Sequence, residues 1–124
     1  MAEQQSKQQS IAEFSRNRDQ LISISSQKQQ YLLQSATLKL SLDELEKTTE
    51  KKVFKAVGNI LVQINTEDAK KELADQKETT DLRIKTLQKQ EDATIQKLNK
   101  LKSEIEKADS GSSSDEKPVK SKKS

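Results

Sequence analysis

A chain of 124 residues has the length of a single domain, yet 35% of its residues are charged, 30% are hydrophobic and only 2% are aromatic. This composition excludes a thick globular core and leaves either a disordered chain or long exposed helices. The net charge of +3, with both signs interspersed, argues against a dedicated nucleic-acid binder, and no apolar run is long enough to span a bilayer.

Histidine and cysteine are both missing from the sequence. Their absence removes the usual general base, the thiolate nucleophile, disulfides and most zinc or copper sites. Nor is there a glycine-rich loop that would cradle phosphates. We therefore expect no enzyme activity, no catalytic residue, no metal and no cofactor. The first ten residues lack the apolar centre of a signal peptide, so we expect a cytoplasmic protein with no membrane partner.

The first predicted element is a helix over about residues 6–47. Its apolar residues recur mostly at intervals of three, four or seven, as one helical stripe requires. They are Ile11, Phe14, Leu21, Ile24, Tyr31, Leu38, Leu42 and Leu45. Arg18, Lys28 and Ser35 interrupt the stripe, which also slips by about one residue near Ile24. Ser10 and Glu13 match a capping box at the start of the helix.

The second predicted element is a β-hairpin over about residues 53–64. Two short apolar runs, Val53–Val57 and Ile60–Ile64, flank Gly58-Asn59, and glycine at the first of two turn positions is typical of a type II′ hairpin. Both faces of this hairpin are largely apolar, so one chain cannot bury them, and we expect a hub that joins several subunits. The predicted hub residues are Val53, Phe54, Val57, Gly58, Ile60, Leu61, Val62 and Ile64. The alternative is that this run is the middle of one continuous helix.

The third predicted element is a helix over about residues 66–108, with ten positions at alternating steps of four and three. These positions are Leu73, Lys77, Thr80, Ile84, Leu87, Glu91, Thr94, Leu98, Leu101 and Ile105. Six of the ten are apolar, which is enough for a weak coiled-coil seam. Asn65 or Thr66 can cap its start, and two equal arms with a short connector should fold back antiparallel. Residues 109–124, rich in Ser and Lys, are interpreted as a disordered tail.

The segment VFKAVGNILVQINTEDAKKELADQKE resembles the central segment of β-type prefoldin subunits. The matching residues are Val53, Phe54, Lys55, Val57, Gly58, Leu61 and Val62, followed by Ala69 and Leu73. The resemblance covers roughly residues 6–108, and the chain has room for one hairpin, whereas α-type subunits carry two. Phe54 stands where Tyr is frequent, and the basic tail is not a family hallmark.

This resemblance implies a mainly α, prefoldin-like fold and a heterohexamer of two α-type and four β-type subunits. It also implies that the complex captures unfolded proteins without ATP and passes them to a group II chaperonin. The expected partners are therefore other prefoldin subunits, unfolded clients and that chaperonin, with no nucleic acid and no membrane. The alternative function is a structural coiled-coil adaptor without client capture.

The open end of the two arms is the predicted client-binding site. Ile11 and Phe14 of the first arm would face Leu98, Leu101 and Ile105 of the second. At a fraying coiled-coil end, such side chains are transiently exposed and can bind apolar segments of an unfolded chain. The alternative is that they only hold the two arms together.

Overall fold

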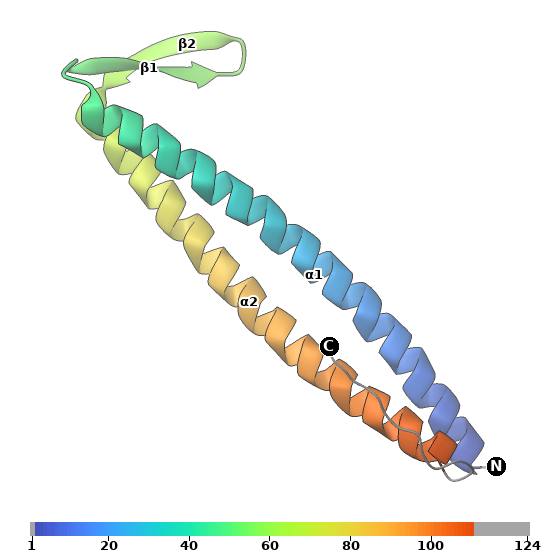
Figure 1. The fold of residues 1–124 in the computed structure, drawn as a ribbon. Coiled ribbons are helices and arrows are strands. Elements are labelled where there is room, and N and C mark those ends of the chain that lie inside the picture. The colour runs from blue at the N-terminus through green and yellow to red at the C-terminus, as the bar shows by residue number, and fades with distance from the viewer. Residues whose placement is uncertain (1, 111–124) are drawn as a thin grey trace. The chain divides into compact units, whose positions relative to one another are not determined.

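The structure is a computed structural model that describes residues 2–110. It contains a helix α1 (Ala2–Lys47), two strands β1 (Lys52–Val57) and β2 (Ile60–Asn65), and a second helix α2 (Thr66–Ser110) (Figure 1). The predicted fold class, two long helices joined by a single β-hairpin, is confirmed, and the continuous-helix alternative is wrong. Of the predicted tail, residues 109 and 110 continue α2, and the remainder lies outside the described residues.

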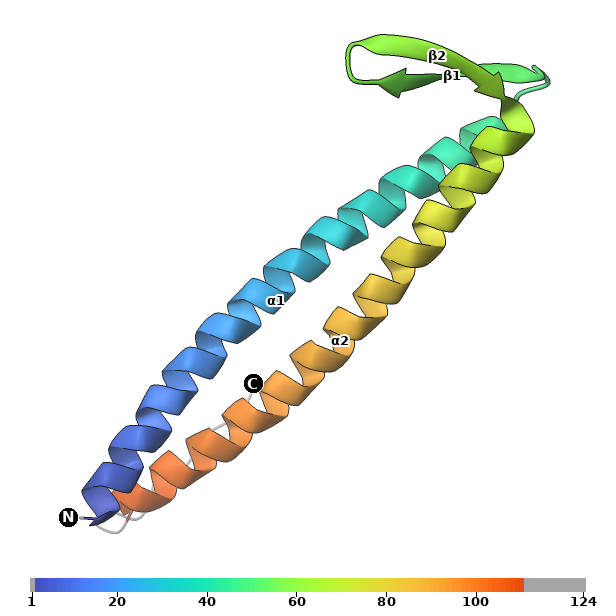
Figure 2. The same ribbon diagram turned by 180° about the vertical axis from the view of Figure 1, so that it is seen from behind.

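The chain divides into two compact units. The hairpin unit, Ser25–Lys89, holds the β-hairpin and the adjoining parts of both helices. Among the described residues, the terminal unit combines residues 2–24 with residues 90–110. Within each unit the two helical segments run side by side, as the front and back views agree (Figures 1 and 2).

Three contacts fix the register of the helices in the hairpin unit. Glu46 pairs with Lys70 at 3.8 Å, Ser35 bonds Asp81 at 2.6 Å, and Lys28 bonds Gln88 at 2.8 Å. The contacts move back along α1 by the same steps, 11 and then 7 residues, by which they move forward along α2. The helices are therefore antiparallel, with a register that does not slip within this unit.

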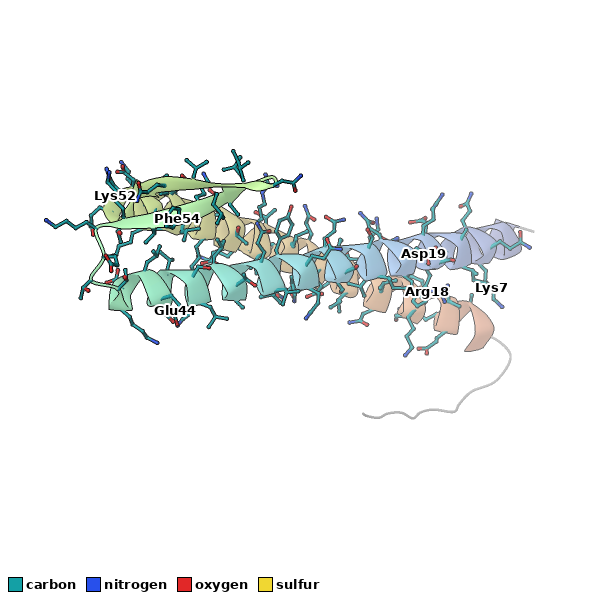
Figure 3. All side chains as sticks on the ribbon, turned by 90° about the horizontal axis from the view of Figure 1, so that it is seen from above. Lys7, Arg18, Asp19, Glu44, Lys52 and Phe54 are labelled. Atoms are coloured by element: carbon teal, nitrogen blue, oxygen red, sulfur yellow. The ribbon has the colours of Figure 1, made fainter. Side chains whose placement is uncertain are left out.

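The inner face of α1 follows a strict alternation of four- and three-residue steps. Its positions, each buried or half-buried, are Ser10, Phe14, Asn17, Leu21, Ile24, Lys28, Tyr31, Ser35, Leu38, Leu42 and Leu45. The predicted slip near Ile24 is wrong. The predicted placement of Ile11 at an inner position is also wrong, because this residue is 46% exposed. The same holds for Arg18, whose side chain lies beside Asp19 on the surface (Figure 3). The heptad spacing, not the apolar character of one residue, decides which side chains face α2.

A polar residue occupies the inner position next to each of these two misplaced residues. Asn17 is buried and satisfies its side-chain amide by donating to the Glu13 carbonyl at 2.7 Å. Ser10 lies well inside α1 because the helix begins at Ala2, so the predicted capping box is also wrong. The preceding residues are mostly Gln, Glu, Lys and Ala, which favour helix and extend it towards the N-terminus.

The inner face of α2 carries the ten positions expected for it. Each of them, from Leu73 to Ile105, is buried or half-buried in the structure. The helix begins with Glu67 and Asp68 in its first turn, where negative charge is favourable against the helix dipole. The Asn65 side chain donates to the Asp68 carboxylate at 3.3 Å, directly before this turn.

Candidate functional site

The β-hairpin turns at Gly58 and Asn59. Gly58 has φ of +61°, a left-handed conformation that residues with a Cβ rarely adopt. The strands pair antiparallel from Lys52 with Asn65 to Val57 with Ile60. This register places Val53, Val57, Ile60, Val62 and Ile64 on one face with Lys55, and Phe54, Ala56 and Leu61 on the other with Gln63.

Both faces of the hairpin remain largely uncovered in the single chain. Only Val53 and Ile64, at the base, are half-buried, while Phe54 is 66% exposed and Leu61 69%. Towards the turn, Val57, Ile60 and Val62 are exposed as well. Figure 3 shows Phe54 on its strand among the side chains of this element. A single two-stranded hairpin is marginal in water, so this exposed apolar surface needs a partner.

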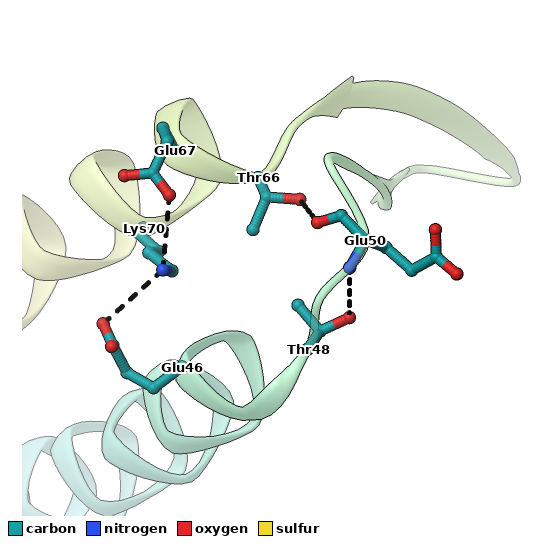
Figure 4. Close-up of polar contacts among 6 residues, drawn as sticks. All are labelled: Glu46, Thr48, Glu50, Thr66, Glu67 and Lys70. Carbon is teal, nitrogen blue, oxygen red and sulfur yellow. Dashed lines mark hydrogen bonds and ion pairs between the residues drawn. The ribbon is translucent and has the colours of Figure 1, made fainter.

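The base of the hairpin is fixed to the helices by polar contacts (Figure 4). Thr66, at the start of α2, donates from its hydroxyl to the Glu50 carbonyl at 2.7 Å and from its backbone N–H to the Lys51 carbonyl at 2.9 Å. Lys70 bridges Glu67 of its own helix and Glu46 of α1, at 3.3 and 3.8 Å. These contacts hold the base of the hairpin, which we call the stem, while the rest of the hairpin stays uncovered.

A groove of about 580 Å³ lies between the hairpin and the helices of the same unit. The apolar residues that line it are Leu45, Val53, Phe54, Ala56, Ile64, Ala69 and Leu73. Lys55 crosses from β1 to pair with Glu72 of α2 at its edge. The face of the hairpin that carries Val53, Lys55 and Ile64 is thus anchored at its base. The apolar residues nearer the turn extend beyond these contacts.

The predicted client-binding residues all lie in the terminal unit but differ in exposure. Leu98 and Leu101 are buried against α1, and Phe14 and Ile105 are half-buried at inner positions. Ile11 alone among the five is exposed at the surface of its helix. Four of the residues therefore pack the seam in this conformation, and Ile11 is available without any opening of the helices.

A polar cluster in the hairpin unit was missed as a unit by the sequence interpretation. The Asp81 carboxylate accepts the Ser35 hydroxyl across the seam at 2.6 Å and the Lys77 ammonium along α2 at 2.8 Å. Hydrogen bonds from Lys77 and then from Ser35 lower the pKa of Asp81 below its ordinary value of 3.8. Arg83 of α2 also lies 5.9 Å from the ring centre of Tyr31 on α1, a cation–π contact in the same unit.

Within residues 2–110, no cluster of three or more His, Cys, Asp or Glu side chains is placed to hold a metal ion. Across the same part of the chain, neither helix contains an apolar stretch that would cross a membrane.

Comparison with known proteins gives a consistent family. A sequence profile of prefoldin subunits matches residues 8–110. Prefoldin subunit beta of Pyrobaculum calidifontis is 43% identical over 89 residues, 71% of each chain, and that of Archaeoglobus fulgidus is 40% identical over 99 residues, 73% of this chain and 85% of the relative. The crystal structure of the prefoldin beta subunit from Thermococcus strain KS-1 matches with a TM-score of 0.78 and 30% identity, over 83% of this chain and 91% of that one.

Proposed function

Because the chain belongs to the prefoldin family, we propose that it is a β-type subunit that captures unfolded proteins without ATP and passes them to a group II chaperonin. Family membership itself makes the chain a chaperone subunit that assembles with other prefoldin subunits. The proposal adds the α-type and β-type composition of the heterohexamer, the clients, the chaperonin and a cytoplasmic location.

The uncovered hairpin is the observation that carries the assembly part of this proposal. Apolar side chains project from both of its faces, and burying each large one contributes roughly 1.5–3 kcal/mol. Hairpins of the same kind in partner subunits would offer matching apolar faces and unpaired strand edges. We therefore assign the hub to the hairpin. Its residues are Val53, Phe54, Val57, Gly58, Ile60, Leu61, Val62 and Ile64.

Client capture is assigned to the terminal unit. Ile11 offers exposed apolar surface, and it lies within one helical turn of the half-buried Phe14 on α1. Opening of the helix ends would add Phe14, Leu98, Leu101 and Ile105 to the surface that a client meets. Contacts of this kind are apolar and weak one by one, so several subunits holding one client would act through avidity. Such capture needs no nucleotide.

The test is an aggregation assay of the hexamer formed with an α-type partner. A denatured enzyme should stay soluble without ATP, and adding a group II chaperonin should then release it in folded form. If the hexamer forms but does not slow aggregation, the adaptor function replaces the chaperone proposal. If the hexamer keeps the enzyme soluble but does not pass it to the chaperonin, client capture is supported and the proposed transfer is refuted.

A further inference from the structure

The seam between α1 and α2 contains a polar cluster where a coiled coil normally packs apolar side chains. Ser35 is 9% exposed and Thr80, next to Asp81, is 5% exposed, so both polar side chains are buried at this level. Ser35 reaches across to the Asp81 carboxylate, which the Lys77 ammonium holds from its own helix. A buried polar residue that finds a polar partner in only one alignment is a known means of fixing register in coiled coils.

The apolar residues of this seam do not fix the register by themselves. In the observed register, each inner position of α1 faces one inner position of α2, and three of these facing pairs are apolar on both sides. They are Leu42 with Leu73, Tyr31 with Ile84, and Phe14 with Leu101. If α2 slid by one heptad, three levels would again do so: Leu38 with Ile84, Ile24 with Leu98, and Leu21 with Leu101. Apolar pairing alone therefore gives little preference between the two alignments.

The polar cluster does distinguish these alignments. After the slide, Ser35 would face Leu87, and Thr80 would face Leu42. The Ser35 hydroxyl would also lose the Asp81 carboxylate, because Gln88 would take its level and offer only a neutral amide oxygen, and a hydrogen bond to a charged group is the stronger of the two. The stem contacts of Thr66 also oppose a slide, but they act only at the hairpin end of the helices.

We propose that Ser35, Asp81 and Lys77 form a register clasp that holds α1 and α2 in a single antiparallel alignment away from the hairpin stem. The clasp is independent of the proposed chaperone activity. Its role is to decide which residues of the two helices lie at the same level, beyond the point that the stem can control.

Cross-linking can read this register directly, because the chain has no cysteine of its own. Lys28→Cys with Gln88→Cys reports the observed alignment, and Lys28→Cys with Ile95→Cys reports a slide of one heptad. Each pair is placed in the full-length chain and treated with a short bismaleimide, and intrachain products are identified by mass. In the otherwise unchanged chain, only the 28–88 pair should react above background.

Removing the clasp with Ser35→Ala, Lys77→Ala and Asp81→Ala should raise the 28–95 product. A hydrogen bond to a charged group shifts an equilibrium by roughly tenfold or more, so an increase of at least about tenfold is expected. The matched control is Lys39→Ala with Asp43→Ala, a lysine–aspartate pair of the same spacing on the outer surface of α1. It should leave the 28–88 product dominant.

The single variant Ser35→Ala guards against unfolding of the triple variant. It removes the bond across the seam and leaves the Lys77–Asp81 pair in α2 intact. If it retains the circular dichroism of the unchanged chain and the 28–95 product rises, the clasp is supported. If 28–88 remains the sole product in a helical Ser35→Ala chain, the stem alone sets the register and the proposal is overturned.

Discussion

The buried hydroxyl of Thr66 donates to the Glu50 carbonyl at 2.7 Å, which ties the first residue of α2 to the loop that enters β1. Thr66 is only 4% exposed, less than Ala69 or any of the buried leucines. Thr66→Val keeps the shape and removes this bond, so the free energy of unfolding should fall by about 1 kcal/mol. Urea denaturation followed by circular dichroism measures the change.

Thr86→Val is the matched control for this substitution. Thr86 is an exposed residue of α2 whose hydroxyl donates to the Leu82 carbonyl of its own helix at 3.1 Å. Loss of that bond should change stability by less than about 0.5 kcal/mol, as is usual for surface sites. Equal losses of stability in the two variants would mean that the Thr66–Glu50 bond stabilises the fold no more than an ordinary surface hydrogen bond does.

Assembly should depend on the exposed hairpin and not on exposed apolar residues in general. Phe54→Asp would place a charge in the proposed hub and should abolish the hexamer while much helicity remains, since burying an unpaired charge costs several kcal/mol. Ile60→Asp should do the same. Leu33 on α1 is as exposed as Phe54, at 69% against 66%, so Leu33→Asp should leave assembly intact. Sedimentation velocity distinguishes these results, and an intact Phe54→Asp hexamer would refute the hub.

The clasp gives stability a defined acid dependence. The folded pKa of Asp81 lies below its ordinary value of 3.8, so folding favours the charged carboxylate. Its contribution is therefore complete above about pH 4 and is lost as the pH falls through the lower folded pKa. In Asp81→Asn this part of the acid dependence should be missing. Urea unfolding between pH 7 and pH 2.5 tests this, and parallel curves for the two proteins would contradict it.

Much of the fold follows from short-range pattern. Gly58-Asn59 between two β-branched runs predicts the hairpin, and the regular spacing of α2 predicts its inner face. The inner face of α1 is harder to predict, because Ile11 and Arg18 lie one position away from the polar residues, Ser10 and Asn17, that face inwards. A ranking by hydrophobicity chooses the wrong member of the first pair, and only the heptad of the whole helix corrects it.

The polar cluster could be recognised only after the alignment of the two helices was known. In the sequence, Lys77 and Asp81 are an ordinary pair four residues apart, of the kind found on many solvated helix faces. The available signal was the combination of Ser35 and Lys77, two polar residues at inner positions of opposite arms. Their connection through Asp81 depends on a contact 46 residues apart in the chain, which no local pattern contains.

Client capture should depend on the terminal unit, and its residues can be separated by exposure. Ile11→Ser removes exposed apolar surface without disturbing the seam, so assembly and stability should stay unchanged while protection of an aggregating client weakens. Replacing Phe14, Leu101 and Ile105 together with Ser should reduce protection further and also loosen the helix ends, because Leu101 is buried and the other two are half-buried.

The control for capture is a triple variant that removes a similar amount of apolar surface elsewhere. Leu33, Leu40 and Leu82 are all exposed in the hairpin unit, and their replacement by Ser should leave protection nearly unchanged. Light scattering of a denatured client beside gel filtration of each hexamer gives both readings. If the control loses protection and the Phe14, Leu101 and Ile105 variant retains it, clients bind along the helices of the hairpin unit and not at the terminal unit. Full protection by both would assign capture to the partner subunits, because the hexamer would then hold its client without either surface of this chain.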